Sequence, residues 1–150
     1  MGHVRDASGR ARPACDAARM SSYTVVNLLE LEDTVGDRAP GLEGRFGRKH
    51  LGSRDLGISH WRYAPNFRTP VSHTHGEQEE AYIVLSGSGR IRLDDELVDV
   101  RQWDVVRVAP EVVRGFESGD EGLELIAVGG PRPEEGDGQL SDAPWPGEEG

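Results

Sequence analysis

The sequence predicts an all-β protein that folds as a sandwich or barrel. Short apolar runs recur at regular spacing in the middle of the chain, a pattern typical of strands. Clusters of glycine, proline, asparagine and aspartate separate these runs, and almost no segment favours a helix. The expected strands cover residues 57–63, 67–75, 81–85, 89–93, 97–100, 105–108, 112–117 and 123–128.

Turn-forming residues set the expected ends of these strands. Residues 64–66 are Ala-Pro-Asn and predict a turn, because proline fixes φ and asparagine tolerates left-handed geometry. Residues 86–89, Ser-Gly-Ser-Gly, predict a tight turn between two strands. The pair at 94–95 predicts a hairpin, and residues 118–122 are expected to form a loop.

The length of 150 residues is that of one domain with a core of its own. Residues 1–20 lack hydrophobic periodicity and are expected to be a disordered N-terminal extension. Residues 21–130 are expected to form the single domain, with its barrel at about 56–128. Residues 131–150 are acidic and rich in proline and glycine, so the sequence predicts a flexible tail there.

Charge and hydropathy argue against several classes of partner. The formal net charge of −10 is unlike the basic surface that nucleic-acid binding requires. No apolar run approaches the ~20 residues of a membrane span, and no signal peptide is evident. Cys15 is the only cysteine, which excludes an internal disulfide and permits a reducing compartment. The sequence therefore predicts a cytoplasmic protein that binds neither nucleic acid nor membranes.

Two histidines and a glutamate have the spacing of a metal site. His73 and His75 are two residues apart, so on a strand they project from one face, about 6–7 Å apart. After a polar turn, Glu80 begins an apolar strand on which Tyr82 shares its face. Two imidazoles and one carboxylate with open positions are typical of non-haem iron sites. We therefore expect His73, His75 and Glu80 to hold one divalent ion of Fe, Mn, Ni or Zn.

This stretch resembles the first motif of the cupin superfamily, which is HxH, four residues, Glu, six residues, Gly. His73, His75, Glu80 and Gly87 match it within the phrase EEAYIVLSGSG. The resemblance is to a small single-domain cupin, similar to the type-2 kind, and covers about residues 56–128. It implies a double-stranded β-helix, or jelly-roll barrel, and a homodimer.

The second cupin motif is degenerate in this chain. Trp103-Asp104 stands where Gly-Asp is usual, Glu111 replaces a glycine and Ser118 an asparagine. Arg114 falls where the family has its fourth metal ligand, a histidine, although a guanidinium has no lone pair to offer a metal. Three arrangements follow for Arg114. It turns aside or binds an anionic ligand beside a metal, it pairs with Glu80 in a metal-free pocket, or it points outward.

Other side chains are candidates for lining the pocket. Tyr82 lies on the Glu80 face, and His60 lies on an expected neighbouring strand. The resulting hypotheses are a metal-dependent enzyme of oxygenase or isomerase type, a non-catalytic binding protein and a metal-free degenerate cupin. The first two would act on or bind a small molecule, with Arg114 as a grip for an anionic one.

Overall fold

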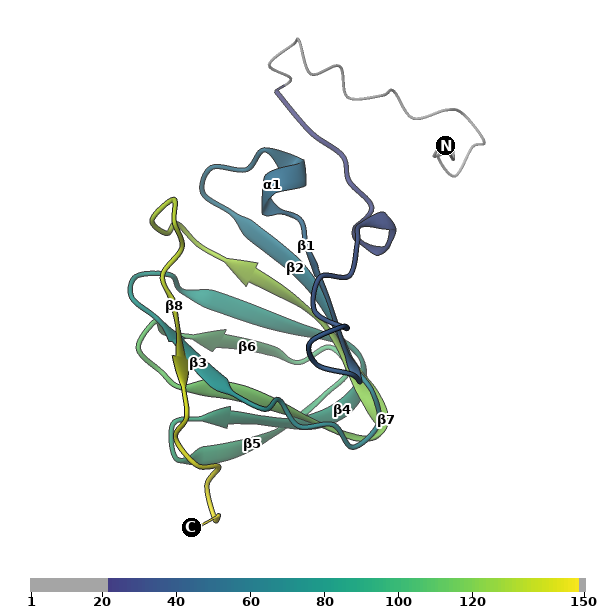
Figure 1. Ribbon diagram of the computed structural model, residues 1–150, viewed down its shortest axis with the longest axis vertical. Helices are drawn as coiled ribbons and strands as arrows, with labels where there is room; N and C mark the ends of the chain where they lie inside the picture. Colours follow the sequence, from purple (N-terminus) through teal and green to yellow (C-terminus); the bar gives the residue numbers. More distant parts are fainter. Residues whose placement is uncertain (1–21, 149–150) are drawn as a thin grey trace.

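The structure is a computed structural model that describes residues 22–148, and this part of the chain is mainly β structure (Figure 1). Two short helical turns, η1 (Leu28–Glu30) and α1 (Arg48–Leu51), lie before β2. The strands of this range are β1 (Leu42–Phe46), β2 (Gly57–Tyr63), β3 (Ser72–His75), β4 (Glu80–Leu93), β5 (Glu96–Arg101), β6 (Val105–Val108), β7 (Arg114–Gly129) and β8 (Gly138–Ser141). The all-β prediction is confirmed. The predicted extension at 1–20 lies outside the described residues.

The strands form one curled sheet whose two halves share β4 and β7. The first half of β4 pairs with β6 and with the end of β7, which in turn pairs with β2 and then β1. The second half of β4 pairs with β5 and with the beginning of β7, which contacts β3 and then β8. Two sheet halves that exchange long strands in this way are consistent with the double-stranded β-helix.

The glycines of residues 86–89 bend a strand where the sequence predicts a turn. β4 continues through them, with irregular register at two points. Gly87 has a φ of 74°, and a Cβ atom there would lie 2.1 Å from the carbonyl oxygen of Gly122. A Cβ atom on Gly89 would be equally close to the carbonyl oxygen of Glu117. These glycines therefore allow β4 to cross closely over β7, which likewise runs unbroken through the expected loop at 118–122.

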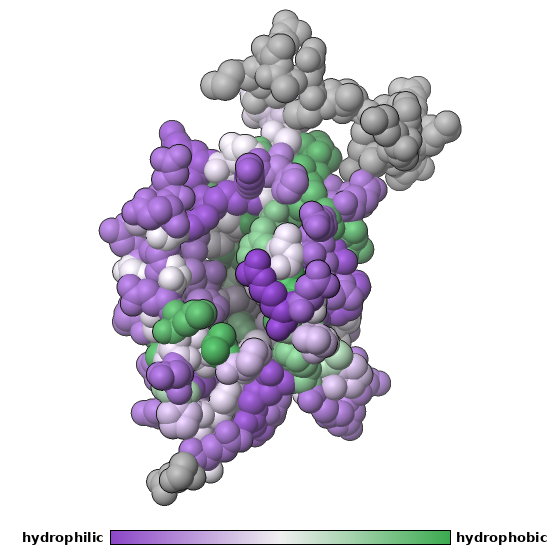
Figure 2. Space-filling model, viewed as in Figure 1, coloured by the Kyte–Doolittle hydropathy of each residue, from purple (hydrophilic) through white to green (hydrophobic). Residues whose placement is uncertain are grey.

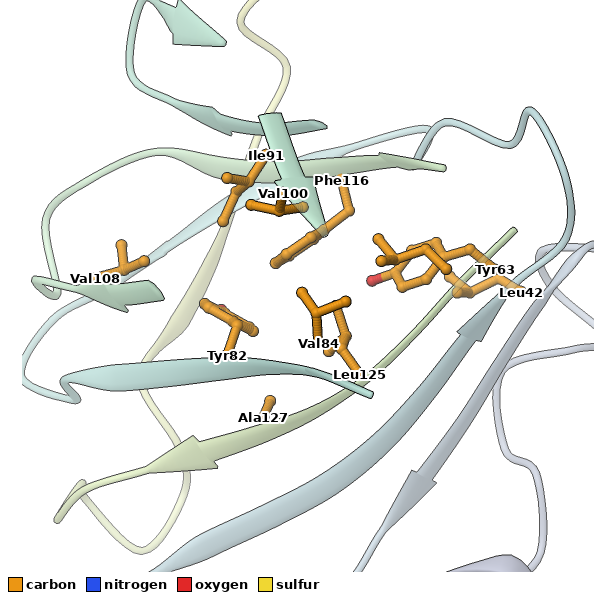
Figure 3. Packing of buried hydrophobic residues seen from close by; sticks show 11 residues of the cluster. Leu42, Tyr63, Tyr82, Val84, Ile91, Val100, Val108, Phe116, Leu125 and Ala127 are labelled. Carbon is orange, nitrogen blue, oxygen red and sulfur yellow. The ribbon is translucent and has the colours of Figure 1, made fainter. Parts of the chain in front are cut away.

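The core fills the space between the two halves of the sheet (Figure 3). Phe116 lies at its centre, with its ring 4.8 Å from that of Tyr82 and 5.8 Å from that of Tyr63. Burying side chains of this size contributes about 1.5–3 kcal/mol each. The cluster consists of Leu42, Tyr63, Tyr82, Val84, Ile91, Val100, Val108, Phe116, Leu123, Leu125 and Ala127.

The outer surface is largely polar. The face shown in Figure 2 is mainly hydrophilic with small hydrophobic patches, in keeping with the acidic composition. Within residues 22–148, neither helical turn has the length and apolar content that a membrane crossing needs.

The segment after residue 131 differs from the flexible tail that its composition predicts. β8 pairs with the open edge of β3, and Trp145 is only 8% exposed. The guanidinium of Arg68 covers the indole, and Arg92 donates a hydrogen bond of 2.7 Å to the carbonyl of Ala143. An unpaired strand edge and one buried aromatic side chain are enough to order a segment that is otherwise polar.

Candidate metal centre

His73, His75 and Glu80 converge at one end of the core. β3 presents both histidines from one face, and the turn after it brings β4 back so that Glu80 faces them. The Oε2 atom of Glu80 lies 3.2 Å from His75 Nε2 and 3.6 Å from His73 Nε2. One donor atom from each residue lies within 4.8 Å of the other two. The three side chains that strand parity selects in the sequence therefore lie close together in the structure.

His75 is oriented by an aspartate that sequence reasoning missed. Its Nδ1 atom lies 2.8 Å from Asp137 Oδ1, at a residue 62 positions further along the chain. The other carboxylate oxygen of Asp137 accepts hydrogen bonds from the backbone N–H groups of Glu77 and Gln78. When the Nδ1–H group donates a hydrogen bond to Asp137, the lone pair of the neutral ring lies on Nε2 and faces Glu80. The His75 Nε2 atom is buried and has no hydrogen-bond partner of its own.

The neighbours of Glu80 favour the charged form of its carboxyl group. Burial alone would raise the pKa of its carboxyl group, but the imidazoles of His73 and His75 and the Tyr82 hydroxyl hold that pKa well below its usual range. Tyr82 donates its hydroxyl hydrogen to Glu80 Oε2. For His75, burial alone would lower the pKa, but Glu80 and Asp137 outweigh it and raise the pKa. The carboxylate is thus charged, oriented and available as a ligand.

Arg114 points into the same group from β7, directly opposite His73 in register. Its side chain is fully buried, and its Nε atom lies 3.6 Å from Glu80 Oε2 without a hydrogen-bond partner. The terminal nitrogens donate to the carbonyls of Ala109 and Pro110, at 3.1 Å each. The outward arrangement of Arg114 is therefore not observed. Its guanidinium is hydrogen-bonded to the backbone and lies buried beside Glu80.

The sequence matches the family model described as "Cupin domain" over residues 59–129. The protein is a cupin-domain protein. A cupin protein from Bacteroides fragilis is 19% identical, with a TM-score of 0.62 and coverage of 77% of this chain and 89% of that chain. The polyketide cyclase RemF from Streptomyces resistomycificus is also 19% identical, with a TM-score of 0.62 and coverage of 78% and 82%.

A third similar structure is a nucleoside dehydratase from Streptomyces, which is 17% identical. Its TM-score is 0.62, and the match covers 82% of this chain and 92% of that chain. At these identities the comparisons show a shared fold and leave the reaction open. Among curated proteins, none matches the sequence.

The cupin site has donor spacing that fits a metal ion. With bonds of about 2.1 Å, neighbouring ligand atoms lie about 3.0 Å apart in octahedral and about 3.4 Å apart in tetrahedral geometry. The two separations from Glu80 Oε2, 3.2 and 3.6 Å, are close to these values, and all three donor atoms lie within 4.8 Å of one another. An unpartnered, buried nitrogen on His75 is the atom that a metal would satisfy. His73, His75 and Glu80 therefore fit the metal ion that the cupin fold implies.

His60 does not join His73, His75 and Glu80. It pairs in register with Ile126 of β7, whose neighbours Leu125 and Ala127 face the core, so His60 lies on the opposite face. Its Nε2 atom is 2.8 Å from Glu124. Strand alternation alone did not reveal this, because the inward face of β2 is fixed only by its pairing with β7.

Access to the site is through His73, whose side chain is 33% exposed, compared with 11% for His75 and 13% for Glu80. Two surface cavities, of about 530 and 420 Å³, lie elsewhere, and none of these three residues lines them. His73 is thus the candidate ligand that is most open to solvent.

Proposed function

We propose that the protein binds one divalent metal ion through Nε2 of His73, Nε2 of His75 and a carboxylate oxygen of Glu80. The observation that carries this proposal is the buried Nε2 atom of His75, which faces Glu80 without a hydrogen bond while Asp137 holds the other ring nitrogen. An ion with this donor set, such as Fe(II), Mn(II), Ni(II) or Zn(II), can polarise a carbonyl or activate dioxygen. A small molecule would occupy its open positions.

The residues around the metal ligands support a preference for an anionic or oxygen-rich small molecule. A divalent ion and Arg114 together carry more positive charge than the two carboxylates, Glu80 and Asp137, carry negative charge, which leaves the site positive. Arg114 supplies charge rather than a direct grip, because it is buried and its terminal nitrogens bind two carbonyls. The exposed edge of His73 leaves the approach to the ligands open.

Two similar structures are enzymes that act on small molecules, a polyketide cyclase and a nucleoside dehydratase. They support an enzymatic role without indicating the reaction, since one fold hosts many chemistries. A metal-free binding protein is the second candidate. It is favoured by the donors that already surround the Glu80 carboxylate, the Tyr82 hydroxyl and the Arg114 Nε–H group.

Metal content separates these candidates. Protein purified without oxygen is analysed for metals and then titrated with Mn(II), Fe(II), Ni(II) and Zn(II) by calorimetry. We expect one ion per chain for the wild type and none for His75→Ala. His50→Ala is the matched control, because His50 is an exposed histidine on α1. Equal binding by His75→Ala and the wild type would refute the site.

A further inference from the structure

We infer that Asp137 is a positioning residue for the metal centre, held beside His75 by the packed segment of residues 138–145. We call this segment the C-terminal clasp. The inference rests on the proposed function, since it concerns how well His75 is prepared to bind an ion. It assigns a specific role to a part of the chain that lies beyond the match to the cupin family.

Asp137 makes three side-chain contacts around the ligands. Its Oδ1 atom lies 2.8 Å from His75 Nδ1, and its Oδ2 atom accepts from Glu77 N at 2.6 Å and Gln78 N at 2.8 Å. Its backbone carbonyl accepts a further hydrogen bond of 3.1 Å from Gly76 N. The side chain is 7% exposed. One carboxylate therefore holds both the ring of His75 and the turn that leads to Glu80.

The contact with His75 decides which ring nitrogen carries the proton. A carboxylate accepts hydrogen bonds and donates none, so the neutral ring must place its proton on Nδ1. The Nε2 atom is then left with the lone pair that a metal requires. Without this contact the two neutral forms of the ring would compete, and one of them presents an N–H group to the metal.

The C-terminal clasp keeps Asp137 in this place. β8 lies beside β3 (Figure 1) and pairs with it residue by residue, with Gly138 opposite His75 in register. Further along, Arg92 binds the carbonyl of Ala143, and Trp145 is buried beneath Arg68. The clasp thus binds the strand that carries both histidines. Detachment of the clasp would therefore disturb the orientation of His75.

Asp137→Asn separates the orienting role from a purely structural one. The amide has its lowest free energy when its oxygen accepts hydrogen bonds from the two backbone N–H groups and its NH₂ group points toward His75. Nδ1 must then accept, so the proton moves to Nε2 and blocks the metal. We expect a loss of metal affinity of about 10–100-fold, with little change in the stability of the metal-free protein. Asp142→Asn is the matched control, because Asp142 is an exposed acid in the same segment.

Three measurements test the inference. Calorimetry with Zn(II) gives the affinities of the wild type, Asp137→Asn and Asp142→Asn. Thermal unfolding without metal reports whether the variants fold. Nitrogen NMR of the metal-free proteins, at a pH at which the ring is neutral, reports the tautomer of His75. We expect the Nδ1–H form in the wild type and Asp142→Asn, and the Nε2–H form in Asp137→Asn.

Trp145→Ala tests the clasp without touching the site. We expect it to weaken Zn(II) binding and to broaden the His75 signals, since β8 loses its anchor. Unchanged Zn(II) affinity together with an unchanged tautomer in folded Asp137→Asn would overturn the inference while leaving the metal site intact. Absence of Zn(II) binding by the wild type would defeat the proposed function itself, so the two failures are distinguishable.

Discussion

Replacing Arg114 by histidine should convert a repulsive neighbour of the metal into a fourth ligand. The Nε atom of arginine and the Nε2 atom of histidine are both four bonds from Cα. Arg114 Nε lies 3.6 Å from Glu80 Oε2, the same separation as that of His73 Nε2. A histidine at this position would therefore place its distal nitrogen where a fourth donor is needed. Arg114 itself offers an N–H group and a fixed positive charge there.

The size of the effect follows from the charges. A metal bound about 2.1 Å from Glu80 would lie on the order of 5 Å from the guanidinium, where repulsion is about 6–7 kcal/mol at an effective dielectric of 20. Glu80 attracts both charges and offsets much of this repulsion. We expect a gain in affinity for Ni(II) or Zn(II) of tenfold or more, about 1.4 kcal/mol, from lost repulsion and added ligation.

Calorimetric titration of the wild type, Arg114→His and Arg114→Met measures this gain. Methionine removes the charge, so its affinity separates relief of repulsion from ligation by nitrogen. Both variants lose the hydrogen bonds to Ala109 and Pro110, which we expect to lower metal-free stability by about 1–3 kcal/mol for each unsatisfied carbonyl. Equal or weaker metal affinity in folded Arg114→His would refute the assignment of Arg114 to the fourth position.

Three further predictions concern stability and assembly. Gly87→Ala should destabilise the fold by at least about 2 kcal/mol in denaturant titrations, because φ is 74° and the new Cβ atom would meet the carbonyl of Gly122; a change near zero would contradict the crossing of β4 over β7. Burial alone would raise the pKa of Glu117, but Arg90 and Arg68 lower it overall. Its contribution to stability is therefore complete above the ordinary glutamate pKa and is lost as the pH falls through the lower folded-state value. Denaturation midpoints should fall on acidification below about pH 5, and by less in Glu117→Gln; identical pH profiles would exclude this contribution. We also expect a homodimer, since the edge strand β6 and the turn before it leave apolar side chains in solvent; sedimentation that shows a monomer at micromolar concentration would exclude it.

The parts of the fold that depend on local pattern could be predicted from the sequence. Strand alternation placed Glu80 and Tyr82 on one face, and in the structure Tyr82 donates a hydrogen bond to Glu80, which lies 3.2 Å from His75. The family spacing placed Arg114 at the fourth-ligand position, and it lies opposite His73. The first inference succeeded because alternate residues of a strand share a face, which a sequence displays directly. The second succeeded because the spacing of the family motif is kept in this chain.

The parts that depend on distant pairing could not be predicted in this way. Gly87 and Gly89 resemble a turn in sequence, and only their closeness to the backbone of β7 shows that they serve a strand crossing. Asp137 is one acid among many in an acidic segment, and its contact with His75 spans 62 residues. The one local sign of a docked segment was Trp145, a large aromatic residue among polar ones. Composition favoured flexibility because it takes no account of the open edge of β3.

The position of a bound ion is the most direct test of the metal site. Crystals grown with Zn(II) or Ni(II) and measured at the absorption edge of the metal would locate it by anomalous scattering. We expect one strong peak per chain, within about 2.0–2.2 Å of His73 Nε2, His75 Nε2 and a Glu80 oxygen. A site without a peak at saturating metal, with Glu80 bound instead to Arg114 and Tyr82, would contradict the proposed metal centre and favour the metal-free binding protein.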